Sequence, residues 1–524
     1  MKTLSQLNFG YTDAQNYLDG QPSLHFKNCF LADQHLTQLK DRKVYFLIGE
    51  KGTGKTAYAA YLSQYSESTY NGSTVFVQPT DYYNLVSMQL RLGDRTVADY
   101  SDAWQLALLT AFFHRTNTLF PQIDSGPVAA IRQALDHFLL GTYGGEIADS
   151  LEFIKASREI SAYLRGSAGT AEPHSPDVPL TVHHKFLLQK LRDAIGSYPQ
   201  GLQYCLFVDG LDVRPSELAY DTYIQCVKGL ANAVWILNAT VFQQFADQDF
   251  KIVLLVRPDI LHVAGLQNLN TKVRDNALLL DWRTDYSAYR NSALFRLADR
   301  LLASQQDPPE QVAGAAWDSY FSFNVFDRRT EQYTDAPFIP FLRSSFYRPR
   351  DILTYLEIMR QRMVALGEGD QDKFTSDVFV DKAIRGAYAT YMLGEVRDSL
   401  SFYYKIEEFE LFLKFFEFLS DYIDRRARFF SYGDFVKAFH ALEEYAARNK
   451  DELPVIFQTP DVLLQFLYEL NVICFKIQPA NRKYPITRWC FRERSFANLR
   501  PKVKAGADYV LHYGMARALY TDIL

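Results

Sequence analysis

The chain has 524 residues, more than a single hydrophobic core usually supports, so two to four domains are expected. Apolar residues make up 48% of the sequence and charged residues 22%, a composition that excludes a disordered chain. A net charge of −5 excludes a protein that coats nucleic acid with its whole surface.

The five cysteines lack the paired spacing of a disulfide framework or a zinc knuckle. No apolar stretch reaches the roughly 18 uninterrupted residues of a membrane span, and the first ten residues lack the order of a signal peptide. We therefore expect a cytoplasmic protein without a membrane partner.

An α/β domain is predicted for residues 41–300, after a helical lead-in at 1–40. Residues 44–48 form a short apolar run that stops at a glycine-rich loop and is followed by a helical pattern. Three more runs of this kind are typical of buried strands and lie at 74–77, 204–208 and 251–256. Apolar runs separated by helical stretches indicate a parallel sheet.

Helical periodicity dominates two other parts of the first 404 residues. Residues 81–200 are interpreted as a helical insertion in the α/β domain, with an exposed, mobile stretch rich in Ser, Gly and Pro at 166–179. Strand signals vanish after about residue 300, which predicts an all-α lid at 301–404.

The segment 405–524 is predicted to be a winged-helix domain. Helical patterns around 407–424 and 432–448 precede Thr459 and Pro460, an N-cap followed by proline at the first helical position. That helix leads to two short strands, 472–477 and 486–491, joined by a turn, and this order is typical of a winged helix.

The glycine-rich loop matches the pattern GxxxxGK[ST] between a strand and a helix. In that place its backbone amides can surround the phosphates of a nucleotide, with Lys55 on the β and γ phosphates and the Thr56 hydroxyl on Mg²⁺. The alternative is a glycine-rich turn with an incidental lysine. The predicted phosphate-binding residues are Gly49, Glu50, Lys51, Gly52, Thr53, Gly54, Lys55 and Thr56.

Two carboxylates follow the apolar run 204–208. Asp209, at the strand end, is predicted to hold Mg²⁺ through water, and Asp212 is predicted to polarise the attacking water. For Asp212, capping of a following helix is a competing interpretation.

Several arginines are candidates for contact with the γ phosphate. Arg257 ends the predicted strand 251–256 and either senses that phosphate or forms an ion pair. Arg350, with Arg348 beside it, opens a helix of the lid and either swings toward the nucleotide or stays on the surface. The candidates for a finger that completes a neighbouring subunit's site are Arg214, Arg283 and Arg296.

Taken together, Gly-Glu-Lys-Gly-Thr-Gly-Lys-Thr, Phe-Val-Asp-Gly-Leu-Asp, a strand ending in Arg-Pro, and Arg-Pro-Arg-Asp-Ile-Leu resemble the STAND and KAP-like P-loop ATPases of the wider AAA+ group. The sequence looks most like the bacterial stand-alone type found among prophage and defence genes. The resemblance implies ATP and Mg²⁺ as ligands, slow hydrolysis, and a switch that assembles into a homo-oligomer or controls a protein effector, with phage defence as a possible setting.

Within this resemblance, Lys55 and Thr56 take the Walker A role and Asp209 the Walker B role. Asp212 is the implied catalytic acid, Arg257 falls at the sensor-1 strand, and Arg350 or Arg348 at the sensor-2 position. One departure from the AAA+ pattern is that Gly210, not an acid, follows Asp209, which puts the hydrolysis rate in question.

Two other functions stay open. The stretch from Lys476 to Lys504 holds nine Lys or Arg residues against one acid, Glu493, which favours an ATP-dependent DNA-binding or DNA-remodelling protein. The preceding helix opposes it, because it contains Asp461 and Glu469 and no basic residue. The residues predicted to contact DNA are Arg482, Lys483, Arg488, Arg492 and Arg494. A nucleotide-binding module without turnover is the third possibility.

Overall fold

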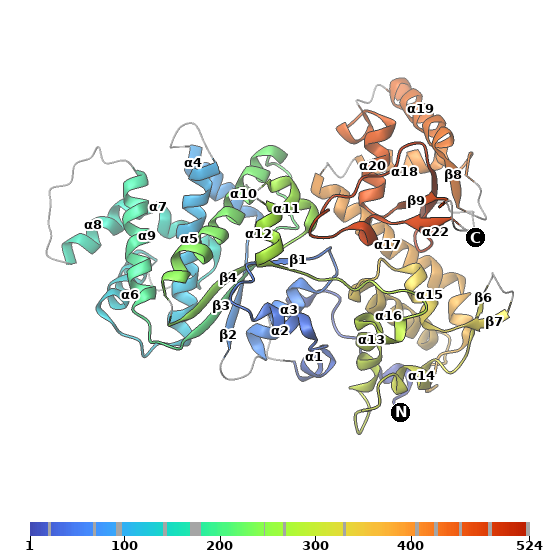
Figure 1. Ribbon diagram of the computed structural model, residues 1–524, viewed down its shortest axis with the longest axis horizontal. Coiled ribbons are helices and arrows are strands. Elements are labelled where there is room, and N and C mark those ends of the chain that lie inside the picture. Colours follow the sequence, from blue (N-terminus) through green and yellow to red (C-terminus); the bar gives the residue numbers. More distant parts are fainter. Residues whose placement is uncertain are drawn as a thin grey trace.

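The computed structural model places a central parallel sheet between a helical insertion on one side and the lid and C-terminal unit on the other (Figure 1). It describes residues 1–18, 23–65, 70–90, 97–139, 144–167, 180–245, 247–265, 269–327, 332–403, 408–423, 428–449, 453–479 and 485–519. Most of the stretch 166–179, for which mobility was predicted, lies outside the described residues.

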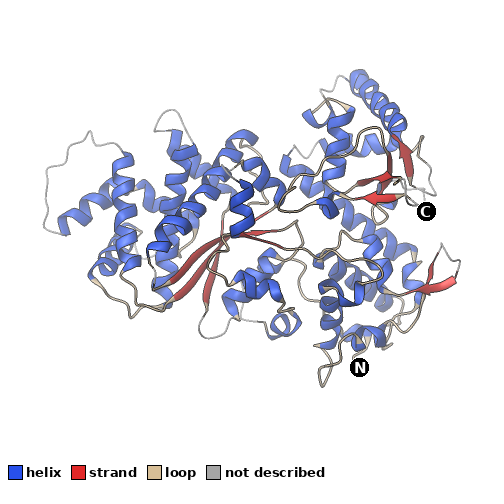
Figure 2. Ribbon diagram, viewed as in Figure 1, coloured by secondary structure: helices blue, strands red, loops and turns tan. Residues whose placement is uncertain are grey.

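The described strands fall into three sheets, seen as separate groups in Figure 2. The largest has five strands, all parallel, in the order β2-β3-β4-β1-β5. This confirms an α/β core with a parallel sheet. The five strands are β1 (Phe46–Ile48), β2 (Asn71–Phe76), β3 (Gln203–Asp209), β4 (Asp249–Val256) and β5 (Ala277–Leu279). The strand β5 has no counterpart among the predicted elements.

Two hydrophobic cores cover the two faces of this sheet. Along β4, Ile252, Leu254 and Val256 enter one core and Val253 and Leu255 enter the other. Successive side chains of a strand point to opposite faces, so a sheet buried on both faces needs a continuous apolar run. This is why the predicted strands lack polar alternation.

One face packs against the helices of the insertion, which confirms the helical pattern predicted for 81–200. The long helices α5 and α10 lie side by side there, and the Trp104 indole N–H donates to the Cys226 carbonyl at 3.1 Å. The helices on this face are α4 (Pro79–Leu90), α5 (Val97–Leu119), α6 (Gly126–Phe138), α7 (Ile147–Lys155), α8 (Ser157–Ser167), α9 (Leu180–Gly196), α10 (Tyr220–Ile236) and α11 (Pro258–Ala264). The short helix α12 (Leu269–Asn276) precedes β5.

The other face packs against the N-terminal helices and the lid. The chain begins on the lid, where the backbone amides of Leu4 and Ser5 donate to the carbonyls of Gln371 and Gly369, both at 2.8 Å. The N-terminal elements are 3₁₀ turns at Leu4–Gln6 and Ala14–Tyr17, α1 (Leu24–Cys29), α2 (Gln34–Leu39) and α3 (Lys55–Gln64). Within the described part of residues 1–40, the helical lead-in consists of these four short elements, two 3₁₀ turns and the helices α1 and α2.

The prediction of an all-α lid is wrong in one place. A two-stranded antiparallel hairpin, β6 (Val325–Asp327) and β7 (Gln332–Asp335), lies among the helices. Its strands are too short and too polar to give a strand pattern in the sequence. The helices of this part are α13 (Ala293–Ala303), α14 (Ala315–Tyr320), α15 (Phe338–Ser344), α16 (Pro349–Ala365) and α17 (Lys382–Tyr403).

The C-terminal unit has a four-stranded antiparallel sheet in the order β10-β9-β11-β8. Its helices are α18 (Glu408–Leu419), α19 (Tyr432–Asn449), α20 (Pro460–Glu469), α21 (Cys490–Glu493) and α22 (Ala516–Leu519). Its strands are β8 (Phe429–Ser431), β9 (Ile473–Ile477), β10 (Ile486–Arg488) and β11 (Asp508–Leu511).

Helix α20 begins as predicted, because the Thr459 hydroxyl accepts from the Val462 amide at 3.2 Å and Pro460 takes the first helical position. The strand predicted to end at Phe491 stops at Arg488. The Phe491 amide donates to the Asn471 side chain at 2.9 Å, and residues 490–493 form α21 instead.

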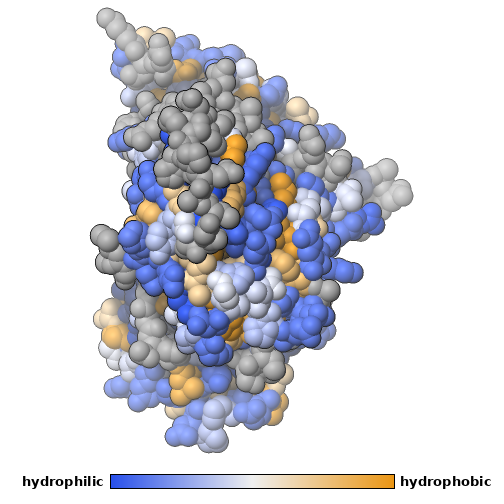
Figure 3. Space-filling model, turned by 90° about the vertical axis from the view of Figure 1, so that its left-hand side faces the viewer, coloured by the Kyte–Doolittle hydropathy of each residue, from blue (hydrophilic) through white to orange (hydrophobic). Residues whose placement is uncertain are grey.

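None of the helices within the described ranges is both long and apolar enough to cross a membrane. Seen from the end that carries the insertion, the surface is mostly hydrophilic, with apolar side chains in narrow strips (Figure 3). This is the surface expected of helices whose apolar sides face a core.

Candidate functional site

The glycine-rich loop connects β1 to α3 at the carboxyl edge of the parallel sheet. Gly52 and Gly54 have φ of +84° and +93°, the left-handed region that glycine adopts without strain, and Gly54 caps α3. The Thr53 hydroxyl donates to the Glu50 carbonyl at 2.8 Å and closes the turn. The sequence therefore folds locally into the compact loop that the GxxxxGK[ST] pattern predicts.

Lys55 lies at the base of this loop with its ammonium group buried. It donates to the carbonyls of Gly49 at 2.9 Å and Glu50 at 3.3 Å, and lies 3.9 Å from the Asp212 carboxylate. Burial lowers its pKa, although the nearby Asp212 and Asp209 favour the charged form. A cation held only by loop carbonyls and one carboxylate can exchange them for a stronger anion.

Thr56 meets the end of β3. Its hydroxyl donates to Asp209 Oδ2 at 2.6 Å, and the Gly210 amide donates to Oδ1 of the same carboxylate at 2.8 Å. Burial raises the pKa of Asp209, and the hydrogen bond from Thr56 only partly offsets this. The two residues predicted to hold Mg²⁺ are thus in direct contact.

The structure explains why no acid follows Asp209. Gly210 has φ of +98°, and a Cβ there would lie 2.4 Å from the Val77 carbonyl oxygen. Any side chain would collide with backbone of the neighbouring strand's end. The second carboxylate of the site is therefore at Asp212. The next described helix, α10, begins only at Tyr220, so Asp212 caps no helix.

A cavity of about 300 Å³ adjoins the loop, Asp209 and Asp212. Its wall combines the loop, the end of β3, an aromatic N-terminal segment, and residues of α13 and α16. The lining includes Phe9, Tyr11, Tyr17, Phe30, Lys51, Gly52, Lys55, Thr56, Asp209, Asp212, Trp282, Leu297, Arg350 and Leu353. The aromatic N-terminal wall is part of the site that sequence reasoning missed, since no short motif marks it.

Arg257 does not line this cavity. Its guanidinium binds both oxygens of the buried Asp259, with Nε 3.1 Å from Oδ1, and the Tyr403 hydroxyl donates to the same carboxylate. Burial alone would lower the pKa of Arg257, but Asp259, Tyr403 and Asp212 together outweigh burial and the net shift is upward. Of the two interpretations left open by the sequence, the ion pair is the one observed, and direct contact with a phosphate does not fit this arrangement.

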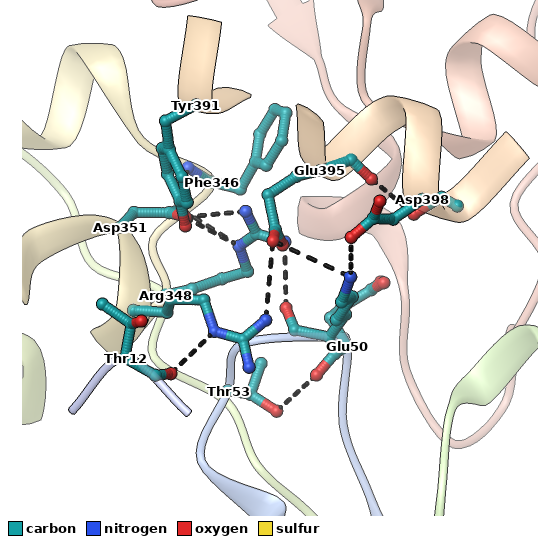
Figure 4. Close-up of polar contacts among 12 residues, drawn as sticks. Thr12, Glu50, Thr53, Phe346, Arg348, Asp351, Tyr391, Glu395 and Asp398 are labelled. Carbon is teal, nitrogen blue, oxygen red and sulfur yellow. Dashed lines mark hydrogen bonds and ion pairs between the residues drawn. The ribbon is translucent and has the colours of Figure 1, made fainter. Parts of the chain in front are cut away.

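Arg348 and Arg350 have different surroundings. Arg348 is buried, binds both oxygens of Asp351 at 2.6–3.1 Å, and donates to the Lys51 carbonyl at 2.9 Å (Figure 4). Arg350 lines the cavity, and its Nε donates to the Thr12 carbonyl at 3.1 Å. Only Arg350 is therefore placed to reach a cavity ligand, while Arg348 joins the lid to the loop.

The C-terminal unit also touches the loop, which the sequence did not predict. Arg494 is buried and forms an ion pair with Glu50. Burial lowers the pKa of Arg494 to about 10. A buried arginine that is paired with the loop cannot contact a DNA backbone. The prediction that Arg494 binds DNA is therefore wrong for this arrangement.

The other four residues predicted to contact DNA are either engaged in contacts within the chain or lie outside the described residues. Arg492 contacts the Tyr347 hydroxyl, and its guanidinium lies 4.8 Å from the Tyr347 ring centre. Arg488 pairs with Glu493 at 2.9 Å. Arg482 and Lys483 lie outside the described residues.

The three finger candidates also differ. Arg283 binds Asp281 and donates to the carbonyls of Arg492 and Arg494, so it serves the docking of the C-terminal unit. Arg214 donates to the Leu218 carbonyl at 2.9 Å. Arg296 is exposed on α13.

Comparisons of this chain with protein-family models, with curated proteins and with solved structures found no match.

Proposed function

We propose that this protein binds a nucleoside triphosphate, ATP in the first instance, together with Mg²⁺, and hydrolyses it slowly to drive a conformational switch. The observation that carries the proposal is the contact between Thr56 and Asp209 beside Lys55, at the carboxyl edge of a parallel sheet. Residues 153 positions apart meet there only because the fold brings strand end and loop together. Ligands bind at this edge in open parallel sheets.

The residues present fit a magnesium ion. Thr56 and Asp209 supply a hydroxyl and a carboxylate, the hard oxygen ligands that Mg²⁺ prefers. Burial raises the pKa of Asp209, and a bound cation would favour its charged form. Bound there, Mg²⁺ would neutralise charge on the β and γ phosphates.

The other groups have distinct roles in this proposal. Lys55 exchanges its two loop carbonyls for phosphate oxygens. Asp212, at the cavity wall, orients the attacking water and accepts its proton. Arg350 reaches the γ phosphate from the lid. Arg257 stays paired with Asp259 and takes no direct part in phosphate binding.

The aromatic N-terminal wall suits a nucleobase. Phe9, Tyr11, Tyr17 and Phe30 line the cavity together with Leu353 from α16. Aromatic side chains stack on any base, so this wall explains base binding without fixing which base is preferred.

The contacts around the loop support a switch. The lid holds the loop through Arg348, and the C-terminal unit holds it through Arg494. We therefore propose that the C-terminal unit is a winged helix used for packing on the loop, and that phosphate state changes this packing to control self-assembly or an effector protein, in the manner of STAND-type ATPases with a defence role.

Binding is tested by titrating MgATP into the native chain and into Lys55→Met. The dissociation constant should rise about 100-fold in the variant, because a charge-assisted contact to two phosphates is lost. Lys251→Met is a matched control, since Lys251 is also buried and donates to two carbonyls, of Leu39 and Asp41, away from the cavity. Equal weakening in both variants, or no binding by the native chain, would overturn the proposal.

Hydrolysis is tested with Asp212→Asn. Phosphate release should fall about 100-fold while the dissociation constant for MgATP changes less than about threefold, because a general base acts in the transition state. If native chain and variant release phosphate equally slowly although both bind ATP, the protein is a binding module and not an enzyme.

A further inference from the structure

Glu395, on α17, faces three cations that surround the phosphate loop (Figure 4). One of its oxygens lies 3.5 Å from Arg350 Nη1 and 3.8 Å from Lys51 Nζ, and the other lies 3.4 Å from Arg348 Nη1. Lys51 belongs to the loop and the two arginines open α16. A single carboxylate of the lid therefore meets all the cations that join lid and loop here.

The Glu395 carboxylate has weak polar contacts although its side chain is largely shielded from solvent. Its side chain is 11% exposed, yet its three cation contacts are longer than the 2.7–2.9 Å of a strong charge-assisted hydrogen bond. Within the described part of the chain, no group hydrogen-bonds to Oε2. The neighbouring Asp351 is the opposite case, because it accepts from Arg348, from the Tyr391 hydroxyl at 3.0 Å and from the Phe346 amide at 2.8 Å.

The three cations are not equally free to leave Glu395. Arg348 is fixed by Asp351 and by the Lys51 carbonyl. Arg350 has a backbone carbonyl as its other contact, and its side chain is 21% exposed at the cavity. Lys51 is paired at 2.6 Å with Asp398, whose side chain is 51% exposed. Arg350 and Lys51 are the two that can turn to a new anion.

The charge balance of this cluster explains why Arg350 and Lys51 would move from Glu395 to a bound phosphate. The cluster formed by these three cations with Asp351, Glu395 and Asp398 is neutral, with three charges of each sign. A γ phosphate in the cavity adds negative charge next to Arg350 and hence near Glu395. Two anions then compete for the same cations, and the phosphate has more charge and more acceptor oxygens.

We infer that Glu395 is a positioning residue that competes with a γ phosphate for Arg350 and Lys51, and that it lowers the preference for triphosphate in doing so. It holds Arg350 and Lys51 when no γ phosphate is present and gives them up when one binds. This inference rests on the proposed nucleotide function and adds the group that makes the lid sensitive to the γ phosphate.

Glu395 lies on a helix that contacts other parts of the protein, so loss of its cation contacts can affect those parts. Helix α17 ends at Tyr403, whose hydroxyl donates to Asp259 at the edge of the sheet. The same helix packs against α18 and α22 of the C-terminal unit. Release of Glu395 therefore acts on the helix that connects lid, sheet edge and C-terminal unit.

The test measures the dissociation constants of MgADP and of a non-hydrolysable MgATP analogue for the native chain and Glu395→Gln. Without the competing carboxylate, the preference for triphosphate over diphosphate should rise about tenfold, mainly through tighter binding of the analogue. Glu357→Gln is the matched control, since Glu357 is also a lid carboxylate with an arginine partner, Arg360 at 2.6 Å, away from the cavity. It should leave the preference unchanged.

A double-variant cycle separates this role from a structural one. In an Arg350→Met background, Glu395→Gln should change the preference less than about twofold, because the cation for which the anions compete is gone. Hydrogen exchange of residues 391–403 should differ between the analogue-bound and ADP-bound native chain, and this difference should vanish in Glu395→Gln.

An unchanged or lower triphosphate preference in Glu395→Gln, or the same change in the Arg350→Met background, would overturn the inference while leaving the proposed function intact. Failure of the native chain to bind either nucleotide would instead overturn the proposed function. If Glu395→Gln does not fold, Glu395→Asp keeps the charge but withdraws it from Arg350, and its triphosphate preference should rise about threefold.

Discussion

The loop side and the lid side of the cavity are built from contacts of different range. On the loop side, Lys55 and Thr53 donate to carbonyls of Gly49 and Glu50, all within one turn of chain. On the lid side, Arg348 donates to a carbonyl 297 residues away, and Arg494 pairs with Glu50 from near the other end of the chain. The loop side can form from its own sequence, whereas the lid side forms only when three parts of the chain are packed together.

This difference indicates that local sequence determines ligand binding, whereas packing between distant parts of the chain determines the conformational response to the ligand. Local contacts fix the shape of the phosphate loop and hence the capacity to bind. Contacts between distant parts add energy only in one relative placement of those parts, so they can respond to a ligand.

The largest expected effect comes from a substitution at Gly210, which follows β3 beside the loop side. In Gly210→Ala the new Cβ collides with the Val77 carbonyl, and φ of +98° is strained for alanine, so the free energy of unfolding should fall by about 4 kcal/mol. Denaturant unfolding measures this. Gly201→Ala is the control: φ there is +77° but the site is open, and only about 1 kcal/mol should be lost. Equal losses would contradict the collision.

A smaller effect is expected when the lid side is broken at Arg494. Arg494→Met leaves Glu50 without its partner and should lower the free energy of unfolding by about 2 kcal/mol. Arg488→Met, from the same basic segment, removes an ion pair whose side chains are 42% and 32% exposed and should cost about 0.5 kcal/mol or less. If both variants unfold alike in denaturant, the docking of Arg494 on the loop is not what stabilises this side.

A pH titration sharpens the comparison further, because His512 lies between C-terminal unit and lid. Its Nε2 contacts the Ser345 carbonyl at 3.3 Å, and its Nδ1 accepts from the Gly514 amide at 3.2 Å. Burial, with Arg428 nearby, lowers the pKa of His512 from 6.5 to about 3. Below pH 6.5 the His512 imidazole binds a proton in the unfolded chain but stays neutral in the folded chain. The free energy of unfolding therefore falls with falling pH.

From this residue alone the expected loss is about 2 kcal/mol at pH 5 relative to pH 7. The variant His512→Gln should lose that part of the pH dependence, whereas His440→Gln, exposed on α19 beside Glu443, should keep it. Unfolding midpoints measured from pH 7 to pH 4 test this. A native-like slope in His512→Gln would exclude His512 as its source.

Prediction from sequence succeeded where the signal was continuous along the chain. The four strands predicted for the parallel sheet, the helical insertion, and the start of α20 at Thr459 and Pro460 all rest on local periodicity or capping. It failed at the hairpin β6-β7, at β8 and β11 of the C-terminal sheet, and at β5, although residues 277–280 form an apolar run. The two hairpin strands carry polar residues and pair with each other, and that pairing leaves no pattern in the sequence.

By itself, the sequence determined the phosphate loop, because glycines with positive φ, a lysine and a threonine at fixed spacing specify one local shape. Only the tertiary structure decided which cations reach the cavity. Arg257 and Arg350 give equally plausible sequence signals, but Asp259 captures the first and the packing of α16 turns the second toward the cavity. The physical reason is that a long charged side chain takes whichever partner the fold brings within reach.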